Sequence, residues 1–409
     1  MAAVLVRDRD DACPGVVDTS PADDGLIARV RLPGGRLDPA RLRELAELAE
    51  RFGTGSVDLT ARANIQVRGL AEADVPAFAH AVAAAGLMPS RSHDRVRNIL
   101  ASPLAGRDPL ALLDADAVLA AVDSALCATP ELTALSGRFL IGIDDGGVPI
   151  ASARHDLDLI ALTGDTFALH AAGHDTGWRV TPANAAGAIV HAARAFLTAR
   201  AAGGAWHIRE LPGGAAEFAA CLATDPVRAQ LSAPAGTAPR ERPRAGRSKR
   251  PLVGVSTQSD GRYALGALVP LGRLTQHHLA ALVEVGAELR ITTARGIVLR
   301  DLLDPAAATA GLEAAGLPCD PASPWRGVTA CSGQGACRRA RSDVRTDATR
   351  HALGHARSTT EHLAPLGATD THWVGCARAC GRPAGATLLV ACEDGGYEIV
   401  PPGGTPTPG

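Results

Sequence analysis

Four cysteines near the end of the sequence have the type and spacing to bind a redox cofactor. Cys331 and Cys337 lie in TACSGQGAC, and Cys376 and Cys380 lie in VGCARACGRP, with 38 residues between the two pairs. Soft thiolate ligands hold iron in four-cysteine iron–sulfur clusters. Two alternatives remain: structural zinc, whose paired cysteines are usually separated by about two to four residues, and packing cysteines that act as small hydrophobic residues. The spacing favours the cluster.

The basic residues are almost all arginine. Lys249 is the only lysine among the 41 lysine and arginine residues. Guanidinium holds carboxylates through paired hydrogen bonds but does not give up its proton. A site that binds carboxylates in this chain must therefore use arginine, and no lysine is at hand to donate protons there.

Composition limits the classes of protein that the chain can belong to. A length of 409 residues predicts several domains, and 46% hydrophobic with 21% charged residues is typical of a globular chain. No apolar stretch is long enough to span a membrane, and the first residues reach charges before a signal-peptide core could form. Nine cysteines without an export signal favour a reducing compartment. We expect a cytoplasmic protein without a membrane partner.

An internal repeat organises the elements that must position these residues. The segment GLIARVRLPGGRL (25–37) is matched by YALGALVPLGRL (263–274). Each copy predicts a strand, a Pro/Gly turn and then a helix, capped by Asp38 in the first copy and by Thr275 in the second. A second strand is predicted to follow, from Ser56 and from Leu289, on which Thr60-Ala61-Arg62 matches Thr293-Ala294-Arg295. The two copies lie more than 200 residues apart in the sequence, which indicates a duplicated half and not a solenoid repeat.

Duplicated halves often share a cleft, so Arg62 and Arg295 could face one ligand. Between the halves lies Ser232–Pro251, rich in proline and arginine and without aromatic residues. This composition favours a solvated linker over a nucleic-acid site. We predict half-domains at 1–85 and 252–310, an α/β domain at 90–230, a linker at 232–251 and a domain with the four motif cysteines at 320–409.

The chain resembles the sirohaem-type nitrite and sulfite reductases and, within that superfamily, the precorrin-3B synthases. The segments that carry the resemblance are Cys13-Pro14-Gly15, DGLIARVRLPGGRL (24–37), DLTARANIQVRGL (58–70), RVRNILASPLAG (95–106), RFLIGIDDGG (138–147), GRYALGALVPLGRL (261–274) and the two cysteine motifs. The resemblance implies an α+β fold with a pseudo-twofold axis, in which two ferredoxin-like half-domains accompany α/β domains that bind a cluster and a macrocycle.

The resemblance also implies roles for particular residues. The four motif cysteines would bind a [4Fe–4S] cluster, and Arg62, Arg97 and Asn98 match positions that hold macrocycle carboxylates or a small anion. Arg138 stands where the family usually has lysine. Charge recognition is therefore expected at Arg138, whereas proton donation from this position is not.

The implied activity is that of a monooxygenase, an oxidoreductase that hydroxylates precorrin-3A at C20 with O2 and closes a γ-lactone in aerobic cobalamin biosynthesis. The cluster would relay electrons from an external donor, NADH through a reductase or ferredoxin, and a mononuclear non-haem iron would activate O2. His351 with His355, or His170 with His174, could hold that iron, although solvated faces are favoured for both pairs. The alternative is a compact sirohaem-dependent sulfite or nitrite reductase, and a non-catalytic electron carrier is disfavoured by size.

Overall fold

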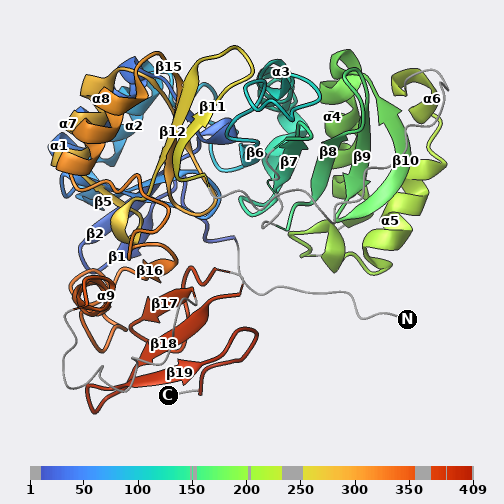
Figure 1. Ribbon diagram of the computed structural model, residues 1–409. Helices are drawn as coiled ribbons and strands as arrows, with labels where there is room; N and C mark the ends of the chain where they lie inside the picture. Colours follow the sequence, from blue (N-terminus) through green and yellow to red (C-terminus); the bar gives the residue numbers. More distant parts are fainter. Residues whose placement is uncertain are drawn as a thin grey trace.

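The computed structural model describes residues 11–147, 150, 154–200, 204–232, 252–354, 370–383 and 385–407. Figure 1 shows three parts: two half-domain sheets with their helices at the upper left, a mixed sheet at the right, and a smaller lobe with the C-terminus below the half-domains. The predicted α+β class with duplicated halves is confirmed. The predicted linker lies, apart from Ser232, outside the described residues, and the domain boundaries remain predictions.

The two half-domain sheets have the same architecture and exchange one strand. The first sheet has the order β1-β2-β5-β4-β13 and the second the order β11-β12-β15-β14-β3. The Gly-Arg-Leu segments supply the exchanged strands, because β3 pairs with β14 of the second half and β13 pairs with β4 of the first. Their bounds are β1 Ser20–Ala22, β2 Gly25–Val30, β3 Arg36–Leu37, β4 Ser56–Leu59, β5 Ile65–Leu70, β11 Gly254–Thr257, β12 Tyr263–Ala267, β13 Arg273–Thr275, β14 Glu288–Ile291 and β15 Ile297–Leu302.

The predicted helix caps are confirmed in both halves. Helix α1 (Pro39–Phe52) begins after Asp38, whose carboxylate accepts a hydrogen bond from the Arg41 N–H at 2.9 Å. Helix α7 (Gln276–Val285) begins after Thr275 and ends at Gly286, whose φ of 68° is left-handed. With α2 (Val75–Ala84) and α8 (Pro305–Ala314), these helices form the layer at the upper left of Figure 1. Local capping signals were therefore sufficient to place α1 and α7.

The strand predicted after each of these helices is instead a hairpin. Residues 56–59 and 65–70 form antiparallel β4 and β5, and 288–291 and 297–302 form β14 and β15. The Thr-Ala-Arg triplets therefore lie in the hairpin turns. In the first turn, the Thr60 N–H donates to the Asn64 carbonyl at 2.9 Å. The prediction of one continuous strand is wrong here, because polar side chains in the turn form hydrogen bonds with the local backbone and so allow the chain to reverse.

The mixed sheet has the order β10-β9-β8-β7-β6, in which β6, β7 and β8 are parallel. Helix α3 covers it near the half-domains and α4 and α5 farther away (Figure 1). Turn η1 (Pro33–Gly35) of the first half contacts β6 and α3. The bounds are β6 Ile99–Ala101, α3 Ala115–Cys127, β7 Ile141–Asp144, β8 Leu157–Ala161, β9 Phe167–Ala171, β10 His174–Val180, α4 Pro182–Arg200, η4 Ile208–Glu210, α5 Gly214–Ala223 and α6 Arg228–Leu231.

The C-terminal lobe contains the four motif cysteines. Its sheet runs β16-β17-β18-β19, with β16 (Val328–Ala330) and β17 (Thr371–Val374) parallel. Strands β18 (Thr387–Ala391) and β19 (Tyr397–Val400) complete it, and α9 (Val344–Ala352) packs beside β16. Turn η5 (Pro270–Gly272) of the second half contacts β16 and α9, as η1 contacts β6 and α3. Each half-domain thus contacts the domain that follows it through the same turn.

In the described part of the chain, no helix combines the length and apolar character needed to cross a membrane.

Candidate active site

Both cysteine motifs leave the same edge of the C-terminal sheet. Cys331 follows β16 and Cys376 lies two residues after β17, and these parallel strands pair through Ala330 and Trp373. The Cys331 N–H donates to the Trp373 carbonyl at 2.9 Å, and the Gly375 N–H points at the Cys331 sulfur at 3.4 Å. Parallel neighbours end on the same side of a sheet, and that topology brings the two motifs together.

The four thiols lie close to one another. Burial raises the pKa of the Cys380 thiol, and the other three motif cysteines raise it further. Among the described residues, no three His, Cys, Asp or Glu side chains converge closely enough to hold a single metal ion. Four cysteine thiolates are the donor set that holds a [4Fe–4S] cluster, and they are also one of the sets that hold structural zinc.

A surplus of positive charge surrounds these thiols. Arg345 on α9 lies near Cys331, and burial together with repulsion from Arg273 lowers the pKa of Arg345 to about 10. Asp58 is the neighbouring carboxylate, and it already forms hydrogen bonds with Arg273 at 2.7 and 3.0 Å. A thiolate-ligated cluster is anionic, so it would provide the counter-charge that Arg345 otherwise shares with Arg273.

Groups from both half-domains hold the backbone of the cysteine loops. Arg68 on β5 donates to the Ala336 carbonyl at 3.0 Å while Asp24 holds its guanidinium at 2.8 and 2.9 Å. Arg295 donates to the Gly381 carbonyl at 2.5 Å. His372 donates from Nε2 to the Cys380 carbonyl at 3.0 Å, and burial lowers the pKa of His372 to about 4, so the ring is neutral. Arg295, predicted to face a shared ligand with Arg62, therefore lies on the cysteine loop.

A second group of predicted residues meets at the mixed sheet. Arg62 donates from Nη1 to the Gly137 carbonyl at 3.4 Å, and Asn98 donates to the same oxygen at 2.8 Å. Arg138 is the next residue along the chain. Strands β6 and β7 begin side by side, so Asn98 and Arg138 precede neighbouring strands at one sheet edge. The structure thus brings Arg62, Asn98 and Arg138 together.

Arg97 lies apart from that group. Its guanidinium forms two hydrogen bonds with Asp123 of α3, at 2.7 and 2.6 Å, and the residue is 5% exposed. Alternation along the chain sends the side chains of Arg97 and Asn98 in different directions. Arg97 is therefore an ion-pair partner of α3 in this structure.

Two further arginines that were not predicted belong to this site, Arg29 on β2 and Arg31 directly after it. Burial and repulsion from Arg29 lower the pKa of Arg31 to about 10, and Arg62 also lies nearby. Arg31 is 1% exposed, and its Nη1 has no hydrogen-bond partner among the described residues. The Arg-x-Arg spacing in ARVRLPGG was the available signal, because residues two apart in extended chain point to the same side. Arg29, Arg31, Arg62 and Arg138 are called the arginine cluster below.

The chain's own N-terminal segment contacts the arginine cluster. The Asp11 carboxylate accepts hydrogen bonds from Ser136 at 2.8 Å and from Arg138 at 3.3 Å, and it lies 3.6 Å from Arg95. The pKa of Asp11 lies below its usual value, since these contacts outweigh the effect of burial. The guanidinium of Arg138 also lies 4.8 Å from the centre of the Trp206 ring. The arginine cluster therefore already binds one carboxylate, that of Asp11.

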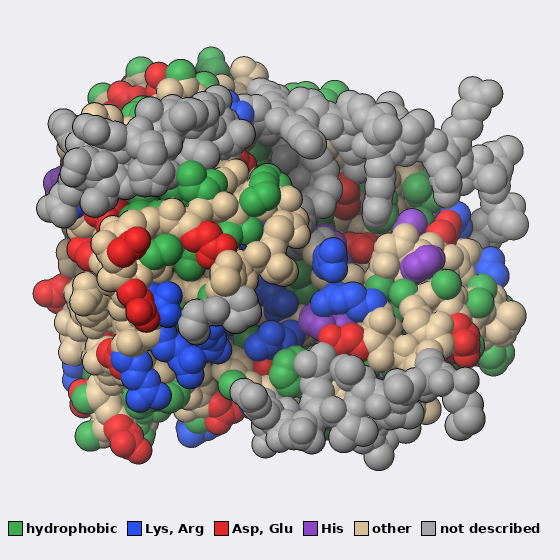
Figure 2. All heavy atoms as spheres, turned by 90° about the horizontal axis from the view of Figure 1, so that it is seen from below, with side chains coloured by type: hydrophobic (Ala, Val, Ile, Leu, Met, Phe, Trp, Pro, Cys, Tyr) green, Lys and Arg blue, Asp and Glu red, His purple; other side chains and the backbone are tan. Residues whose placement is uncertain are grey.

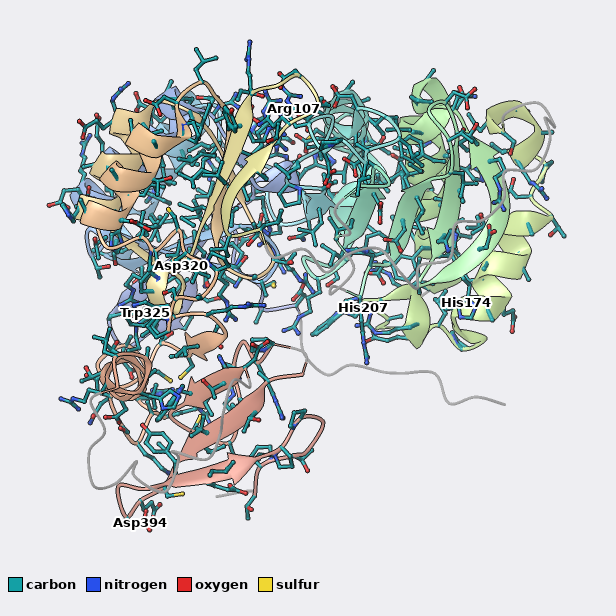
Figure 3. The ribbon with its side chains drawn as sticks, viewed as in Figure 1. Arg107, His174, His207, Asp320, Trp325 and Asp394 are labelled. Carbon is teal, nitrogen blue, oxygen red and sulfur yellow. The ribbon has the colours of Figure 1, made fainter. Side chains whose placement is uncertain are left out.

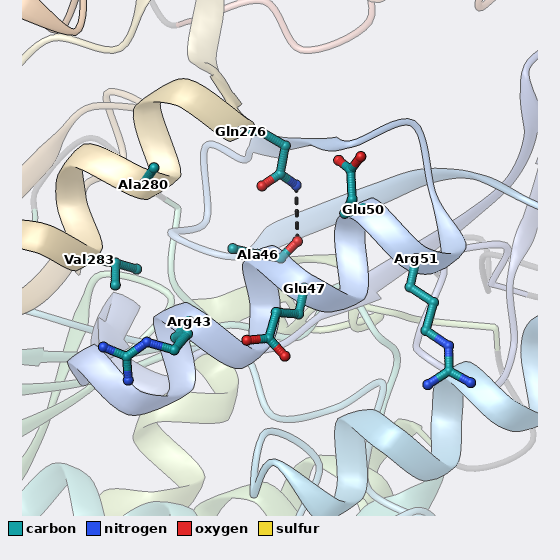
Figure 4. A pocket seen from close by; sticks show the side chains of 8 residues that line it. All are labelled: Arg43, Ala46, Glu47, Glu50, Arg51, Gln276, Ala280 and Val283. Carbon is teal, nitrogen blue, oxygen red and sulfur yellow. Dashed lines mark hydrogen bonds between the residues drawn. The ribbon is translucent and has the colours of Figure 1, made fainter.

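The lower face of the molecule is hollowed, and basic side chains gather in and around the hollow (Figure 2). By contrast, the groove shown in Figure 4 lies between α1 and α7 on the outer helical layer, with a volume of about 410 Å³. Its lining includes Glu47, Arg51 and Val283 but none of the site residues described above. The chemistry of the chain is thus concentrated at the arginine cluster and the cysteine loops.

Comparisons with known proteins agree with this geometry. The family model described as the nitrite/sulfite reductase ferredoxin-like half domain matches residues 20–85. The ferredoxin–nitrite reductase of Synechococcus elongatus is 29% identical over 88% of this chain and 74% of its own length. The precorrin-3B synthase of a Sinorhizobium species is 27% identical over 98% of this chain and 84% of its own. The solved structure of the Mycobacterium tuberculosis NirA protein has a TM-score of 0.68 at 20% identity, over 97% of this chain and 78% of that one.

The half-domain match, the relatives along nearly the whole chain and the shared fold bear out the resemblance drawn from the sequence. Along nearly its whole length the chain is similar to nitrite reductases and to precorrin-3B synthase, both oxidoreductases, and it shares the fold of the NirA protein.

Proposed function

We propose that the chain is a precorrin-3B synthase-like monooxygenase. It would hydroxylate precorrin-3A at C20 with O2 and close a side-chain carboxylate to a γ-lactone in cobalamin biosynthesis. The observation that carries the proposal is the arginine cluster, in which guanidinium groups from β2, the first hairpin turn and the segment before β7 meet beside the buried Nη1 of Arg31, which has no hydrogen-bond partner in the described part of the chain. Convergent arginines suit a macrocycle with many carboxylates.

Two observations favour this reaction over nitrite or sulfite reduction. The precorrin-3B synthase match covers more of both chains than the nitrite reductase match. In addition, Arg138 is held by Asp11 and packs on Trp206, so the position where reductases usually have lysine carries a fixed cation that does not release protons. The contacts of Arg138 with Asp11 and Trp206 support a role for Arg138 in orienting the substrate.

The four motif cysteines would hold a [4Fe–4S] cluster, which supplies one-electron transfer when bound. In this proposal Arg345 balances the charge of the thiolates, and Arg68, Arg295 and His372 fix the loops that carry them. Electrons would come from NADH through a reductase or from a ferredoxin, in the cytoplasm. The arginine cluster would bind and orient the macrocycle, with Arg62 and Arg138 holding carboxylates.

No site for the mononuclear non-haem iron is found among the described residues. His170 and His174 lie on strands β9 and β10 of a hairpin, not on a helix. His351 lies on α9 with its ring 5.3 Å from that of Trp373, and His355 lies outside the described residues. The pairing of His351 with His355 at a second iron therefore stays a prediction, and we derive no step through that iron.

The test is an assay of protein purified without oxygen, after iron, sulfide and zinc have been measured on the same sample. Precorrin-3A, O2 and a reducing system should give a product heavier by one oxygen atom, from a protein with iron and sulfide and without sirohaem bands. Intense sirohaem bands with nitrite or sulfite reduction would establish the alternative instead. Zinc without sulfide would contradict both.

A further inference from the structure

A buried histidine–aspartate pair lies beside the arginine cluster. Asp156 precedes β8 at the sheet edge where Asn98 precedes β6 and Arg138 precedes β7, since the three parallel strands begin side by side. Asp156 is 0% exposed. Its carboxylate accepts hydrogen bonds from the Leu140 N–H at 3.0 Å and from the Ile208 N–H at 2.9 Å. These two hydrogen bonds fix the Asp156 carboxylate in place, and its oxygens can accept further hydrogen bonds.

The third contact of Asp156 is with His207. The His207 Nδ1 lies 3.0 Å from Asp156 Oδ2. A carboxylate can only accept, so the hydrogen on Nδ1 is donated to Asp156 and Nε2 is the ring atom left to exchange a proton. Glu210 fixes the backbone at this point, because its Oε2 accepts from the N–H groups of Trp206 at 2.8 Å and His207 at 3.2 Å.

Charged groups from two other segments lie beside the pair. Arg62 of the first hairpin turn lies close enough to Asp156 to interact with it electrostatically. Arg138 lies over the ring of Trp206, the residue before His207. Figure 3 places His207 at the lower end of the mixed sheet, on the side of the lower face seen in Figure 2. His207 therefore borders the site that Arg62 and Arg138 form.

We propose that His207 is the residue that exchanges protons with the molecule bound at the arginine cluster, and that Asp156 is its positioning residue. This inference rests on the proposed function. An imidazolium at His207 gives the proton on Nε2 to the oxygen atom that enters the macrocycle, becomes neutral, and regains a proton from water. Asp156 keeps its negative charge throughout and stabilises the imidazolium. None of the arginines near the site can perform this exchange.

Kinetics of His207→Gln test the catalytic part. The single-turnover rate should fall by about 100-fold or more, as is typical for loss of a general acid. The Kd for precorrin-3A should change by less than about 3-fold, because the arginines that bind carboxylates remain. Imidazole added to His207→Gly should restore part of the rate, which a purely structural role would not allow. A matched control is His191→Gln, which removes another His–Asp pair (2.8 Å, with Asp225) away from the site and should leave the rate unchanged. An unchanged rate in His207→Gln would overturn the proposal.

A spectroscopic measurement separates this proposal from the proposed function. In wild-type protein labelled with ¹⁵N at histidine, His207 should carry its hydrogen on Nδ1, and Asp156→Asn should abolish that preference. Addition of an octacarboxylate porphyrin should shift the Nε2 resonance of His207 and leave that of His191 in place. Protein that shows the shift but does not hydroxylate precorrin-3A would refute the function and keep the His207 assignment. Porphyrin binding without any Nε2 shift would refute the His207 assignment.

Discussion

The two half-domains have the same hairpin turn but use it for different purposes. In the first turn the Thr60 N–H donates to the Asn64 carbonyl, and in the second the Thr292 N–H donates to the Gly296 carbonyl, both at 2.9 Å. The residues with left-handed φ are Ala63 at 54° and Arg295 at 60°. Arg295 therefore corresponds to Ala63 and not to Arg62. The match of the two Thr-Ala-Arg triplets predicted from the sequence is wrong by one residue.

That single residue decides which domain each arginine contacts. Arg62 donates to Gly137 at the mixed sheet, whereas Arg295 donates to Gly381 in the cysteine loop. Arg68 and Arg300 do correspond, because Ile65 and Ile297 occupy the same position in paired strands. Even these two differ, since Arg68 reaches the cysteine loop and Arg300 pairs with Asp116 of α3. Duplication preserved the backbone while the side chains diverged.

The largest effect is expected where the second half-domain supports the cysteines. Cys380→Ser should lose the cluster, with its iron, sulfide and visible absorbance, and all turnover. Binding of an octacarboxylate porphyrin at the first half-domain should persist, as a titration would show. Cys221→Ala, an exposed cysteine outside the motifs, is the control. Full iron and sulfide content in Cys380→Ser would remove Cys380 from the ligand set.

Arg300→Met should reveal the structural role of its position. Arg300 is 1% exposed and donates to Asp116 at 2.9 Å, so its loss leaves the half-buried Asp116 carboxylate with only part of its counter-charge. We expect the free energy of unfolding in urea to fall by about 3 kcal/mol. Arg68→Met at the corresponding position should instead speed the loss of cluster absorbance under a chelator. A faster loss of the cluster in Arg300→Met at unchanged stability would reverse this assignment.

Arg62→Gln and Arg295→Gln directly test the difference between the two turns. Loss of one charge-assisted hydrogen bond of about 1.4 kcal/mol should weaken porphyrin binding about 10-fold in Arg62→Gln and leave the iron content unchanged. Arg295→Gln should lower cluster retention and leave porphyrin affinity within about 2-fold. Equal effects of the two variants on porphyrin binding would mean that both arginines face one ligand after all.

The smallest effect is expected from the N-terminal segment. Asp11→Asn removes a carboxylate that competes for Arg138 and should tighten porphyrin binding about 3-fold, less than a full charge-assisted contact contributes. Its contacts with Ser136 and the arginines hold the pKa of Asp11 below its usual range, so Asp11 is ionised near neutral pH and the gain should be constant from pH 5 to 8. It should shrink only as acid protonates the wild-type carboxylate. Asp18→Asn, an exposed partner of Arg95, is the control, and an equal gain there would indicate a general charge effect.

The sequence by itself determined the features that depend on neighbouring residues. Asp38 and Thr275 cap helices with hydrogen bonds to residues three positions later, so a local pattern is enough to find them. The same holds for the two cysteine motifs, which topology then brings to one sheet edge. The repeated Gly-Arg-Leu segments likewise revealed the duplication, because the two halves repeat the same local order of elements.

The tertiary structure alone decided which residues meet across the chain. Arg97 binds Asp123 of α3 instead of joining Arg62, and β3 and β13 exchange sheets between the halves. The pairing of His207 with Asp156 joins a loop to a strand edge 51 residues earlier in the sequence. The direction of a guanidinium or imidazole group depends on its exact position in a turn, where a shift of one residue matters, and on a partner far away in the sequence. Local propensity predicts neither the turn register nor the distant partner, because it depends only on residues that are neighbours in the sequence.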